Sequence, residues 1–265
     1  MGGQPSSSSF DRAAEFYDRT RSIGMDALEA SLDLLEKEFS GRGRVLEIGV
    51  GTGMLALPLA ERGFDLVGLD LSAGMMEKLA EKAGGRAPFP LVRGDATLLP
   101  FADGAFGGGY VRWVLHLIPR WRDAVAEACR VVGPGGVILV EPGSYLGRWE
   151  GLWLAMREVL GSEAEHIGLD MVRRPGELDD SFADVEARRR DLPEIVYRDD
   201  EPIAQYFDDV KRKVYSWTWR VPDERLAMAV EVGKRWVIER HGALDVGSDD
   251  ELKLRWRAYD LPLAG

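Results

Sequence analysis

The sequence predicts an α/β fold with a doubly wound, mostly parallel sheet, an antiparallel C-terminal strand and a helical cap insert. Three observations predict it. Short apolar strands alternate with helices from Arg44 to Glu141, which indicates a parallel sheet. After Glu141 the alternation stops, and a helix-rich stretch with several tryptophans follows. The final segment, ELKLRWRAYDL, alternates apolar and polar residues, as an antiparallel strand with one buried face does.

Composition places the chain among ordinary folded proteins. Its 265 residues are 45% hydrophobic and 30% charged, which suits one large domain or a core with a smaller cap. No apolar run approaches the roughly 20 residues that cross a bilayer, and the first ten residues lack a basic region and an apolar signal core. We therefore expect a cytoplasmic protein that does not bind membranes.

Charge argues against nucleic acid as a partner. The net charge is −11, whereas nucleic-acid binding usually needs a basic footprint that releases counterions. The densest basic run, Arg188 to Arg190, is expected to be a solvated helix face. No cluster of cysteine, histidine and aspartate has metal-ligand spacing, so no metal is expected. A small-molecule substrate remains the expected partner, and the pattern predicts no particular oligomeric state.

The elements before the alternating region are predicted from spacing. Residues 1–9 are expected to be a disordered terminus, and a first helix is expected from Phe10 to Thr20. A second helix is predicted from Met25 to Phe39, because its leucines recur at helical spacing and Ser40 and Gly41 can stop it.

Five strands of the parallel sheet are predicted at VLEIGV, FDLVGLD, PLVRGD, GGYVRWV and GVILVEP. Further helices are expected from Ser72 to Lys82 and from Arg120 to Val131. The fourth strand begins with three glycines, residues 107–109, which weaken its propensity.

The remaining chain is divided between cap and core. Residues 145–190 are expected to form a helical cap over the substrate site, while residues 10–144 and 191–265 form the core. Within the second core segment, a strand is expected at EIVYRD and helices near 202–212 and 222–241.

The most informative motif is a hydrophobic strand that ends in a glycine-rich turn, VLEIGVGTG. Glycines there let a ligand approach the backbone at the carboxyl ends of the strands, where open α/β sheets bind ligands. A dinucleotide fingerprint counted from Gly49 would need glycine or alanine where Met54 stands. A pyrophosphate would also be repelled by Glu47. These two facts disfavour a nicotinamide-dependent oxidoreductase.

Three carboxylates follow successive predicted strands around this turn: Glu47, Asp70 and Asp95. A carboxylate in the position of Asp70 can accept hydrogen bonds from both ribose hydroxyls. Together the three suit a ligand with an amine, a ribose and an adenine amino group. S-adenosylmethionine carries all of these and a positive sulfonium, so it is the expected cofactor.

The order of motifs resembles the class I S-adenosylmethionine-dependent methyltransferases, which have a Rossmann-like fold. The matching stretches are VLEIGVGTG, Leu69-Asp70, Gly94-Asp95-Ala96 and the turn from Arg130 to Gly136. The likeness covers about half the chain and is greatest to the small-molecule branch that includes ubiquinone and menaquinone biosynthesis enzymes, the type 11 methyltransferases. It implies in-line transfer of a methyl group to a small-molecule acceptor. The alternative is a catalytically inactive regulatory protein that binds S-adenosylmethionine.

The resemblance also implies roles for individual residues. Glu47 would hold the cofactor amine, Asp70 the ribose, and Tyr17 would close over the site from the amino-terminal helix. Met75 would contact the adenine, although ordinary helix packing explains it equally well. The implied cofactor-binding residues are Tyr17, Glu47, Gly49, Gly51, Thr52, Gly53, Asp70, Leu71, Met75, Asp95, Ala96 and Arg112.

On the substrate side, His116 follows the fourth strand and is the candidate catalytic base. A structural histidine is the alternative interpretation. The expected substrate-contacting residues are Trp113, His116, Tyr145 and Trp149. Further tryptophans, Trp153, Trp217 and Trp219, would suit a hydrophobic or planar substrate, or would pack the cap.

Overall fold

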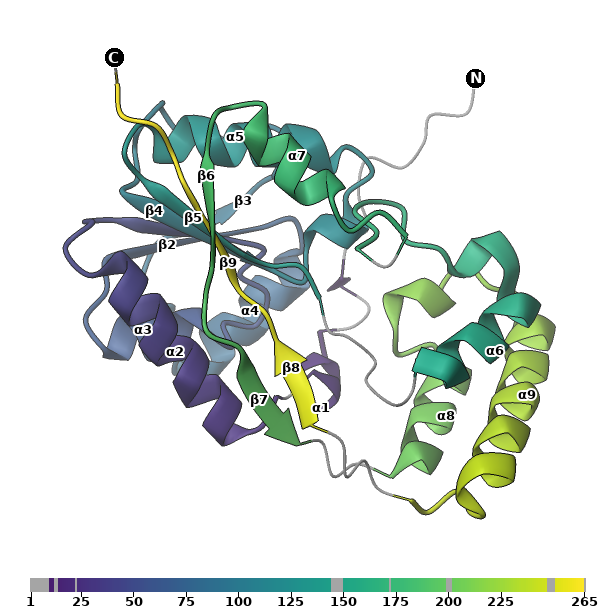
Figure 1. Cartoon of the computed structure of the whole chain (residues 1–265). Helices are drawn as coiled ribbons and strands as arrows, with labels where there is room; N and C mark the ends of the chain where they lie inside the picture. Colours follow the sequence, from purple (N-terminus) through teal and green to yellow (C-terminus); the bar gives the residue numbers. More distant parts are fainter. Residues whose placement is uncertain are drawn as a thin grey trace, which may run out of the picture.

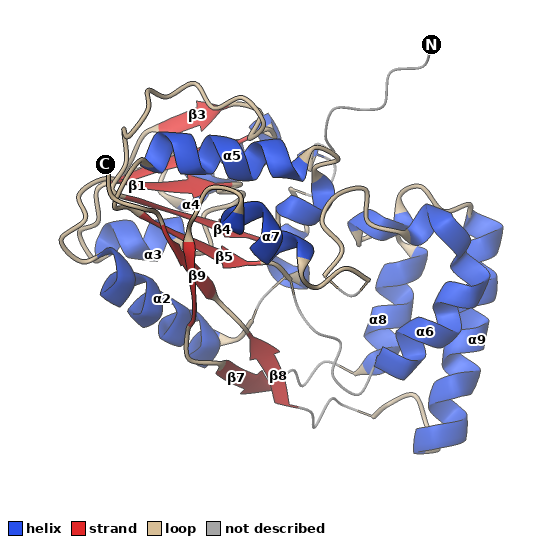
Figure 2. Ribbon diagram, turned by 45° about the horizontal axis from the view of Figure 1, so that its top comes forward, coloured by secondary structure: helices blue, strands red, loops and turns tan. Residues whose placement is uncertain are grey.

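The computed structural model describes residues 10–11, 14–21, 23–143, 150–171, 173–198, 202–246 and 251–264. A layered α/β core lies beside a separate group of helices (Figures 1 and 2). The expected disordered terminus, residues 1–9, lies outside the described residues, and so do Tyr145 and Trp149. Among the described helices, none has the length and apolar character that crossing a membrane would require.

The central sheet has seven strands in the order β3-β2-β1-β4-β5-β9-β6. The first five are parallel, and β9 is antiparallel to both of its neighbours. This arrangement confirms the predicted fold class. The strand bounds are β1 Val45–Ile48, β2 Leu66–Asp70, β3 Leu91–Arg93, β4 Gly108–Arg112, β5 Val137–Glu141, β6 Arg188–Asp191 and β9 Arg257–Asp260.

Helices cover both faces of the sheet because each presents an apolar stripe to it. On one face lie α2 Met25–Phe39, α3 Ala56–Glu61 and α4 Ala73–Lys82, packed against the sheet through Leu35, Leu59 and Leu79. On the other lie α5 Trp121–Val132 and α7 Glu177–Ala183, packed through residues such as Val131 and Phe182. The bounds predicted for α2 are confirmed, and those for α4 and α5 are confirmed to within one residue.

The three glycines at the start of β4 are explained by close packing. A Cβ at Gly107 would lie 1.6 Å from the carbonyl oxygen of Arg42, and one at Gly108 would lie 2.6 Å from the ring of Phe39. The loop after α2 therefore presses directly on this strand, and β4 begins at Gly108 despite its weak propensity.

A helical unit, formed by α6 Glu150–Leu160, α8 Ile203–Lys211 and α9 Asp223–His241, lies to one side of the sheet (Figure 1). It has its own apolar core, which includes Met156, Phe207 and Val230. Gly233 of α9 permits this packing, because a Cβ there would lie 2.7 Å from the ring of Phe207. The prediction that assigned residues 202–246 to the core is corrected: the apolar faces of α8 and α9 meet α6, not the sheet.

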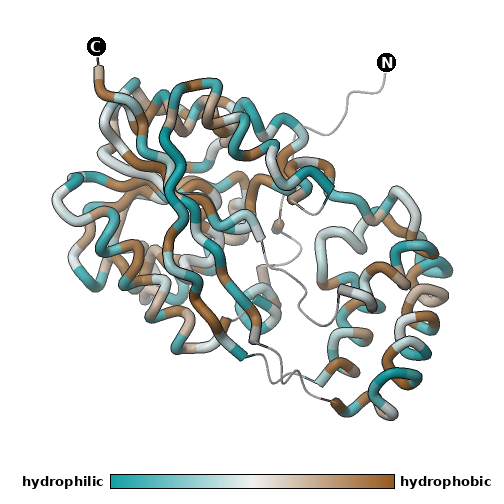
Figure 3. Tube along the Cα trace, viewed as in Figure 1, coloured by the Kyte–Doolittle hydropathy of each residue, from teal (hydrophilic) through white to brown (hydrophobic). Residues whose placement is uncertain are grey.

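The opposite correction applies to residues 177–190, which were expected in the cap. Here α7 packs on the core beside α5, and Arg188–Asp191 form the edge strand β6 in place of a solvated helix face. Figure 3 shows that β6 is hydrophilic along its length. Its strand conformation therefore depends on hydrogen bonding to β9 and on ion pairs, not on an apolar alternation.

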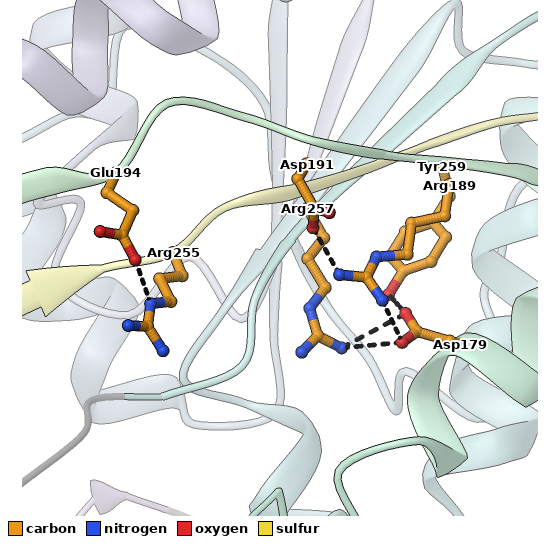
Figure 4. A network of polar contacts seen from close by, with 7 residues as sticks. All are labelled: Asp179, Arg189, Asp191, Glu194, Arg255, Arg257 and Tyr259. Atoms are coloured by element: carbon orange, nitrogen blue, oxygen red, sulfur yellow. Dashed lines mark hydrogen bonds and ion pairs between the residues drawn. The ribbon is translucent and has the colours of Figure 1, made fainter.

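These ion pairs converge on Asp179 of α7 (Figure 4). The Asp179 carboxylate accepts from the Tyr259 hydroxyl at 2.6 Å, from Arg189 Nη1 at 2.7 Å and from Arg257 Nη1 at 3.3 Å. Phe182 stacks on Tyr259 with ring centroids 3.7 Å apart. The contacts bind α7, β6 and β9 into one unit, which we call the Asp179 network.

The C-terminal segment forms two strands where one was expected. β8 Glu251–Leu254 pairs antiparallel with β7 Ile195–Arg198 in a separate ribbon, and only β9 joins the main sheet. Between β8 and β9 the Trp256 side chain is buried. Glu194 fixes the ribbon by pairing with Lys253 at 3.0 Å. It also pairs with Arg255 at 2.5 Å, as Figure 4 shows.

The N-terminal segment lies between the core and the helical unit (Figure 1). A helix was expected from Phe10 to Thr20, and within the described part of this stretch the α-helix is α1, Tyr17–Thr20. The segment is attached to the core by polar contacts. Asp11 Oδ1 accepts from Ser72 Oγ at 2.6 Å and from the Gly74 amide at 2.9 Å, while Asp18 accepts from Lys82 at 2.9 Å.

Candidate active site

A pocket opens at the carboxyl ends of β1, β2 and β4, as expected for an open α/β sheet. Its wall combines the glycine turn after β1, the ends of β2 and β3, the segment after β4, and Phe10 and Tyr17 from the N-terminal segment. Its volume is about 80 Å³, which is below the roughly 300–1,000 Å³ of typical ligand sites. The pocket is thus narrow, and the N-terminal segment supplies two of its lining residues.

The three glycines of the turn have different roles. Gly49, Gly51 and Gly53 all have positive φ, between 53° and 79°. A Cβ at Gly49 would lie 2.1 Å from Val114, and one at Gly53 would lie 2.8 Å from Leu79, so protein packing requires both. At Gly51 the nearest side-chain atom would be Met75 Cε at 3.3 Å. Gly51 and Gly49 line the pocket, and Gly53 does not.

Asp70 stands in the pocket wall at the end of β2. Its Oδ2 accepts from the Gly51 amide and its Oδ1 from the Ser72 amide, both at 2.8 Å. Burial raises the pKa of Asp70, and these backbone hydrogen bonds lower it. The two amides fix the carboxylate and leave its remaining lone pairs for hydroxyl donors in the pocket.

The ends of β2 and β3 supply the other side of the pocket. Leu71, Asp95 and Ala96 all line it. Asp95 Oδ1 accepts from the amide and the hydroxyl of Thr97, both at 2.9 Å, which orients the carboxyl group. Met75 is buried in α4 and also lines the pocket, so it packs within the core and its contact with the adenine stays a prediction.

Arg112, at the end of β4, is a buried cation with unmet hydrogen-bond donors. Its side chain is 7% exposed and lies over the Trp113 ring at 3.9 Å. Its Nε is 4.0 Å from Glu141 Oε2, too far for a hydrogen bond. Within the described part of the chain, Nε and Nη2 have no hydrogen-bond partner. Because unmet buried donors are costly, the geometry suits an anionic group in the pocket.

Glu47 lies beneath the pocket and is not among the residues that line it. Its Oε2 accepts from the Tyr110 hydroxyl at 2.8 Å, and both side chains are buried. Burial raises the pKa of Glu47 to about 8, while the Tyr110 hydrogen bond and the Arg112 charge lower it. A cation in the pocket would favour the ionised form of this carboxyl.

Thr52 and Gly53, both expected at the cofactor, lie outside the pocket wall. The Thr52 hydroxyl donates to Asp18 and so attaches α1 to the glycine turn. Tyr17, one residue before Asp18, then reaches the pocket. Thr52 thus positions a lining residue and does not itself line the site.

The segment after β4 forms the wall where the acceptor was expected. Trp113, Val114, Leu117 and Ile118 line the pocket, and Trp113 has a φ of 56°, a left-handed conformation unusual for a bulky residue. His116 is not among the lining residues. Its ring meets that of His166 edge to face, with centroids 4.9 Å apart, and burial lowers its pKa to about 3.

Several lining residues were not predicted from the sequence. They are Phe10, Ile48, Leu69, Gly94, Val114, Leu117 and Ile118. Ile48, Leu69 and Gly94 adjoin predicted residues, so proximity to a motif could have indicated them. Phe10 carries no local signal, because its place depends on how the N-terminal segment crosses the sheet.

Comparison with known families agrees with this geometry. A family described as a methyltransferase domain matches residues 46–140, the span from β1 to β5. Demethylmenaquinone methyltransferase of Beutenbergia cavernae is 39% identical over 136 residues, 49% of this chain and 55% of the relative. The enzyme of the same name from Renibacterium salmoninarum is 38% identical over 102 residues, 38% of this chain and 42% of the relative. The chain thus spans about half the length of the curated relatives it matches.

Solved structures share the fold over a longer stretch. The YcgJ protein of Bacillus subtilis has a TM-score of 0.61 at 19% identity, covering 89% of this chain and 100% of that protein. The [4+2]-cyclase SpnF has a TM-score of 0.54 at 15% identity, covering 99% of this chain and 100% of that protein. At such identities the likeness establishes the fold, and SpnF illustrates that this fold hosts other reactions. Residues 46–140 thus match a methyltransferase domain, and the order of their motifs resembles that of the class I S-adenosylmethionine-dependent methyltransferases.

Proposed function

We propose that the chain binds S-adenosylmethionine in this pocket and transfers its methyl group to a small-molecule acceptor. Asp70 carries the proposal. It is a carboxylate in the pocket wall, held by the amides of Gly51 and Ser72 and placed to accept hydrogen bonds from two ribose hydroxyls. The relatives named demethylmenaquinone methyltransferase support a small-molecule acceptor.

The other pocket residues suit the rest of this ligand. Arg112 offers two unmet donors to the methionyl carboxylate, and buried Glu47 would supply negative charge near the methionyl amine once that cation favours its ionised form. Asp95 and Ala96 would receive the adenine, with Leu71 and Met75 against the ring. When bound, S-adenosylmethionine supplies a methyl group on a positively charged sulfur.

The protein contributes position and exclusion of water. Trp113, Val114, Leu117 and Ile118 make an apolar wall on the acceptor side, which favours a dry encounter between nucleophile and methyl group. His116 lies behind this wall. With a pKa of about 3 it is a neutral imidazole at neutral pH and a poor proton acceptor. We therefore propose that positioning by the wall contributes more than His116.

Entry of the cofactor requires movement of the N-terminal segment. Phe10 and Tyr17 line the pocket, whose volume is about 80 Å³. The segment is attached through Asp11 and Asp18, which bond to α4 and to the glycine turn. These contacts are polar and partly exposed, so they can open at modest free-energy cost.

Calorimetry tests the cofactor assignment. The intact protein should bind S-adenosylmethionine and S-adenosylhomocysteine more tightly than NAD. Asp70→Ala should weaken binding of both adenosyl ligands by roughly 1–3 kcal/mol, because their hydroxyls lose a charged acceptor. Asp65→Ala is the matched control, since Asp65 is exposed just before β2 and pairs with Arg44. Tighter binding of NAD, or equal effects of the two substitutions, would overturn the assignment.

Methyl transfer is tested separately from binding. A screen with S-adenosylmethionine labelled in its methyl group, against a panel of hydroxylated and aromatic metabolites, should reveal a labelled product. Binding of the cofactor without transfer to any compound of a broad panel would favour the catalytically inactive alternative.

A further inference from the structure

Arg21, directly after α1, lies where the N-terminal segment meets the helical unit. Its guanidinium carbon is 6.0 Å from the centroid of the Tyr17 ring and 4.7 Å from that of Tyr215. Tyr17 lines the pocket, whereas Tyr215 packs against the core of the helical unit. Arg21 therefore stands beside the pocket on the side away from the sheet.

Among the residues that the structure describes, none places a counter-charge in direct contact with Arg21. Its Nη1 donates to the Thr20 carbonyl at 3.0 Å, and among the described residues no carboxylate forms an ion pair with it. Asp209 of α8 acts on Arg21 only through its electrostatic field. The Asp209 carboxylate is instead bonded to Gln205 at 3.1 Å and paired with Arg212 at 3.7 Å.

Such a cation is unusual in a half-buried place. Side chains taken out of water with their charge are normally paired, because desolvation without a partner destabilises the fold. Stacking on Tyr215 offsets part of this cost. The planar guanidinium still has donors that can bind a carboxylate through two parallel hydrogen bonds.

Aromatic rings lead from the pocket towards Arg21. Phe10, in the pocket wall, meets Trp219 with ring centroids 4.8 Å apart. Tyr215 stacks parallel to Trp217 at 6.3 Å, and Trp217 meets Trp153 of α6 at 5.0 Å. Rings from three separate segments thus line the junction, and a flat apolar molecule would find large contact area there.

We propose that the methyl acceptor is a flat apolar molecule bearing a carboxylate, and that Arg21 binds this carboxylate. The proposal rests on the proposed function, since it concerns the acceptor of the same site. Arg21 acts as a specificity-determining residue, because its planar guanidinium orients the carboxylate of the acceptor. The aromatic side chains contact the apolar part of the acceptor, which reaches the wall formed by Trp113 to Ile118.

The test uses matched pairs of probes on protein saturated with S-adenosylhomocysteine. The probes are benzoate, 2-naphthoate and indole-3-acetate, each compared with its neutral amide, and binding is followed by calorimetry. At least one acid should bind roughly tenfold more tightly than its amide, as expected for a charge-assisted bidentate contact. Arg21→Gln should reduce this preference to within about twofold, and Arg21→Lys should retain part of it.

Arg19→Gln is the matched control, because Arg19 is exposed on α1 two residues earlier. It should leave the preference for acids unchanged, and Arg21→Gln should leave the affinity for S-adenosylhomocysteine unchanged. Equal affinity of the intact protein for every acid and its amide would overturn the proposal. The proposal would also be overturned if Arg21→Gln weakened the binding of acids, amides and S-adenosylhomocysteine alike, since Arg21 would then only hold the N-terminal segment in place.

The two proposals fail in different ways. If the intact protein does not bind S-adenosylhomocysteine, the proposed function itself is wrong. If it binds S-adenosylhomocysteine and shows no preference for acids, only the acceptor class is wrong.

Discussion

The two sides of the pocket are built in different ways. On the side proposed for the cofactor, contacts come from short motifs at strand ends, as in Gly51 with Asp70 or Asp95 with Thr97. On the side proposed for the acceptor, contacts join residues about 200 positions apart, such as Phe10 with Trp219 and Arg21 with Tyr215. The difference teaches that the backbone geometry of a sheet edge fixes one half of the site, while packing between distant segments fixes the other.

The sharpest way to test this comparison lies within the glycine turn. Gly53→Ala should lower the free energy of unfolding by about 2–5 kcal/mol, since its Cβ would lie 2.8 Å from Leu79 and its φ is positive. Gly51→Ala should lower the free energy of unfolding by only about 1–2 kcal/mol. It should nevertheless weaken the binding of S-adenosylhomocysteine roughly tenfold or more. Denaturant unfolding and calorimetry separate the two effects. Equal stability losses with no loss of affinity in Gly51→Ala would place the ligand elsewhere.

The next largest effect is expected at Glu47, the buried carboxyl beneath the pocket. Its pKa is raised to about 8 from 4.5, so the folded state holds a proton that the unfolded state releases. Stability is therefore lost as pH rises from about 4.5 to about 8. Glu47→Gln should remove this loss. The free energy of unfolding of the variant should therefore rise by a few kcal/mol relative to that of the natural protein between pH 5 and pH 8.5.

Melting temperatures measured across that range check the expectation. Glu77→Gln changes an exposed residue of α4, and its melting temperature should differ from that of the natural protein by the same amount at every pH. A constant difference between Glu47→Gln and the natural protein would mean that Glu47 is already ionised in the fold.

A third test addresses the part of the core that carries no motif. Asp179→Ala removes the acceptor for Tyr259, Arg189 and Arg257, and should lower the free energy of unfolding by about 1–3 kcal/mol. Asp191→Ala, on the same edge, removes one ion pair from a side chain that is 74% exposed, and should change it by less than about 0.5 kcal/mol. Urea unfolding of both variants measures the contrast. Equal losses would show that the Asp179 network adds no more than a surface pair.

The smallest effect is expected at His116, which lies behind the pocket wall. Burial lowers its pKa to about 3, so the fold keeps it neutral while the unfolded chain takes up a proton below about pH 6.5. Stability is thus lost as pH falls from 6.5, and His116→Gln should reduce that loss. Melting temperatures at pH 7.5 and pH 5 measure it. A fall in turnover of roughly 10² to 10⁴-fold with unchanged melting would instead identify His116 as the general base.

Sequence predicts best where one local rule decides the structure. The leucine spacing of α2 predicted its bounds of Met25 and Phe39, and the motif order predicted the parallel sheet, while the cofactor-binding residues stay a prediction. β6 could not be predicted, because Arg188 to Arg190 have no apolar alternation. These residues become a strand through partners distant in sequence, such as Asp260 and Glu38 for Arg190.

The same reason explains the errors in the helical unit and the pocket wall. The apolar stripes of α8 and α9 predict helices, yet nothing in them distinguishes the sheet from α6 as the surface they cover. His116 and Leu117 are neighbours in one short 3₁₀ turn, and only the packed structure shows that Leu117 lines the pocket while His116 meets His166.

The place of β9 has a consequence for how the chain folds during synthesis. β9 lies between β5 and β6, although about 115 residues and the whole helical unit separate it from β5 in sequence. At a rate of synthesis of roughly 5–20 residues per second, β9 is made on the order of 6–23 s after β5. During that interval the apolar edge VILVE is open to pairing with other chains. Aggregation should therefore be decided while the ribosome is still making the helical unit, and chaperones that cover strand edges should raise the yield of folded protein.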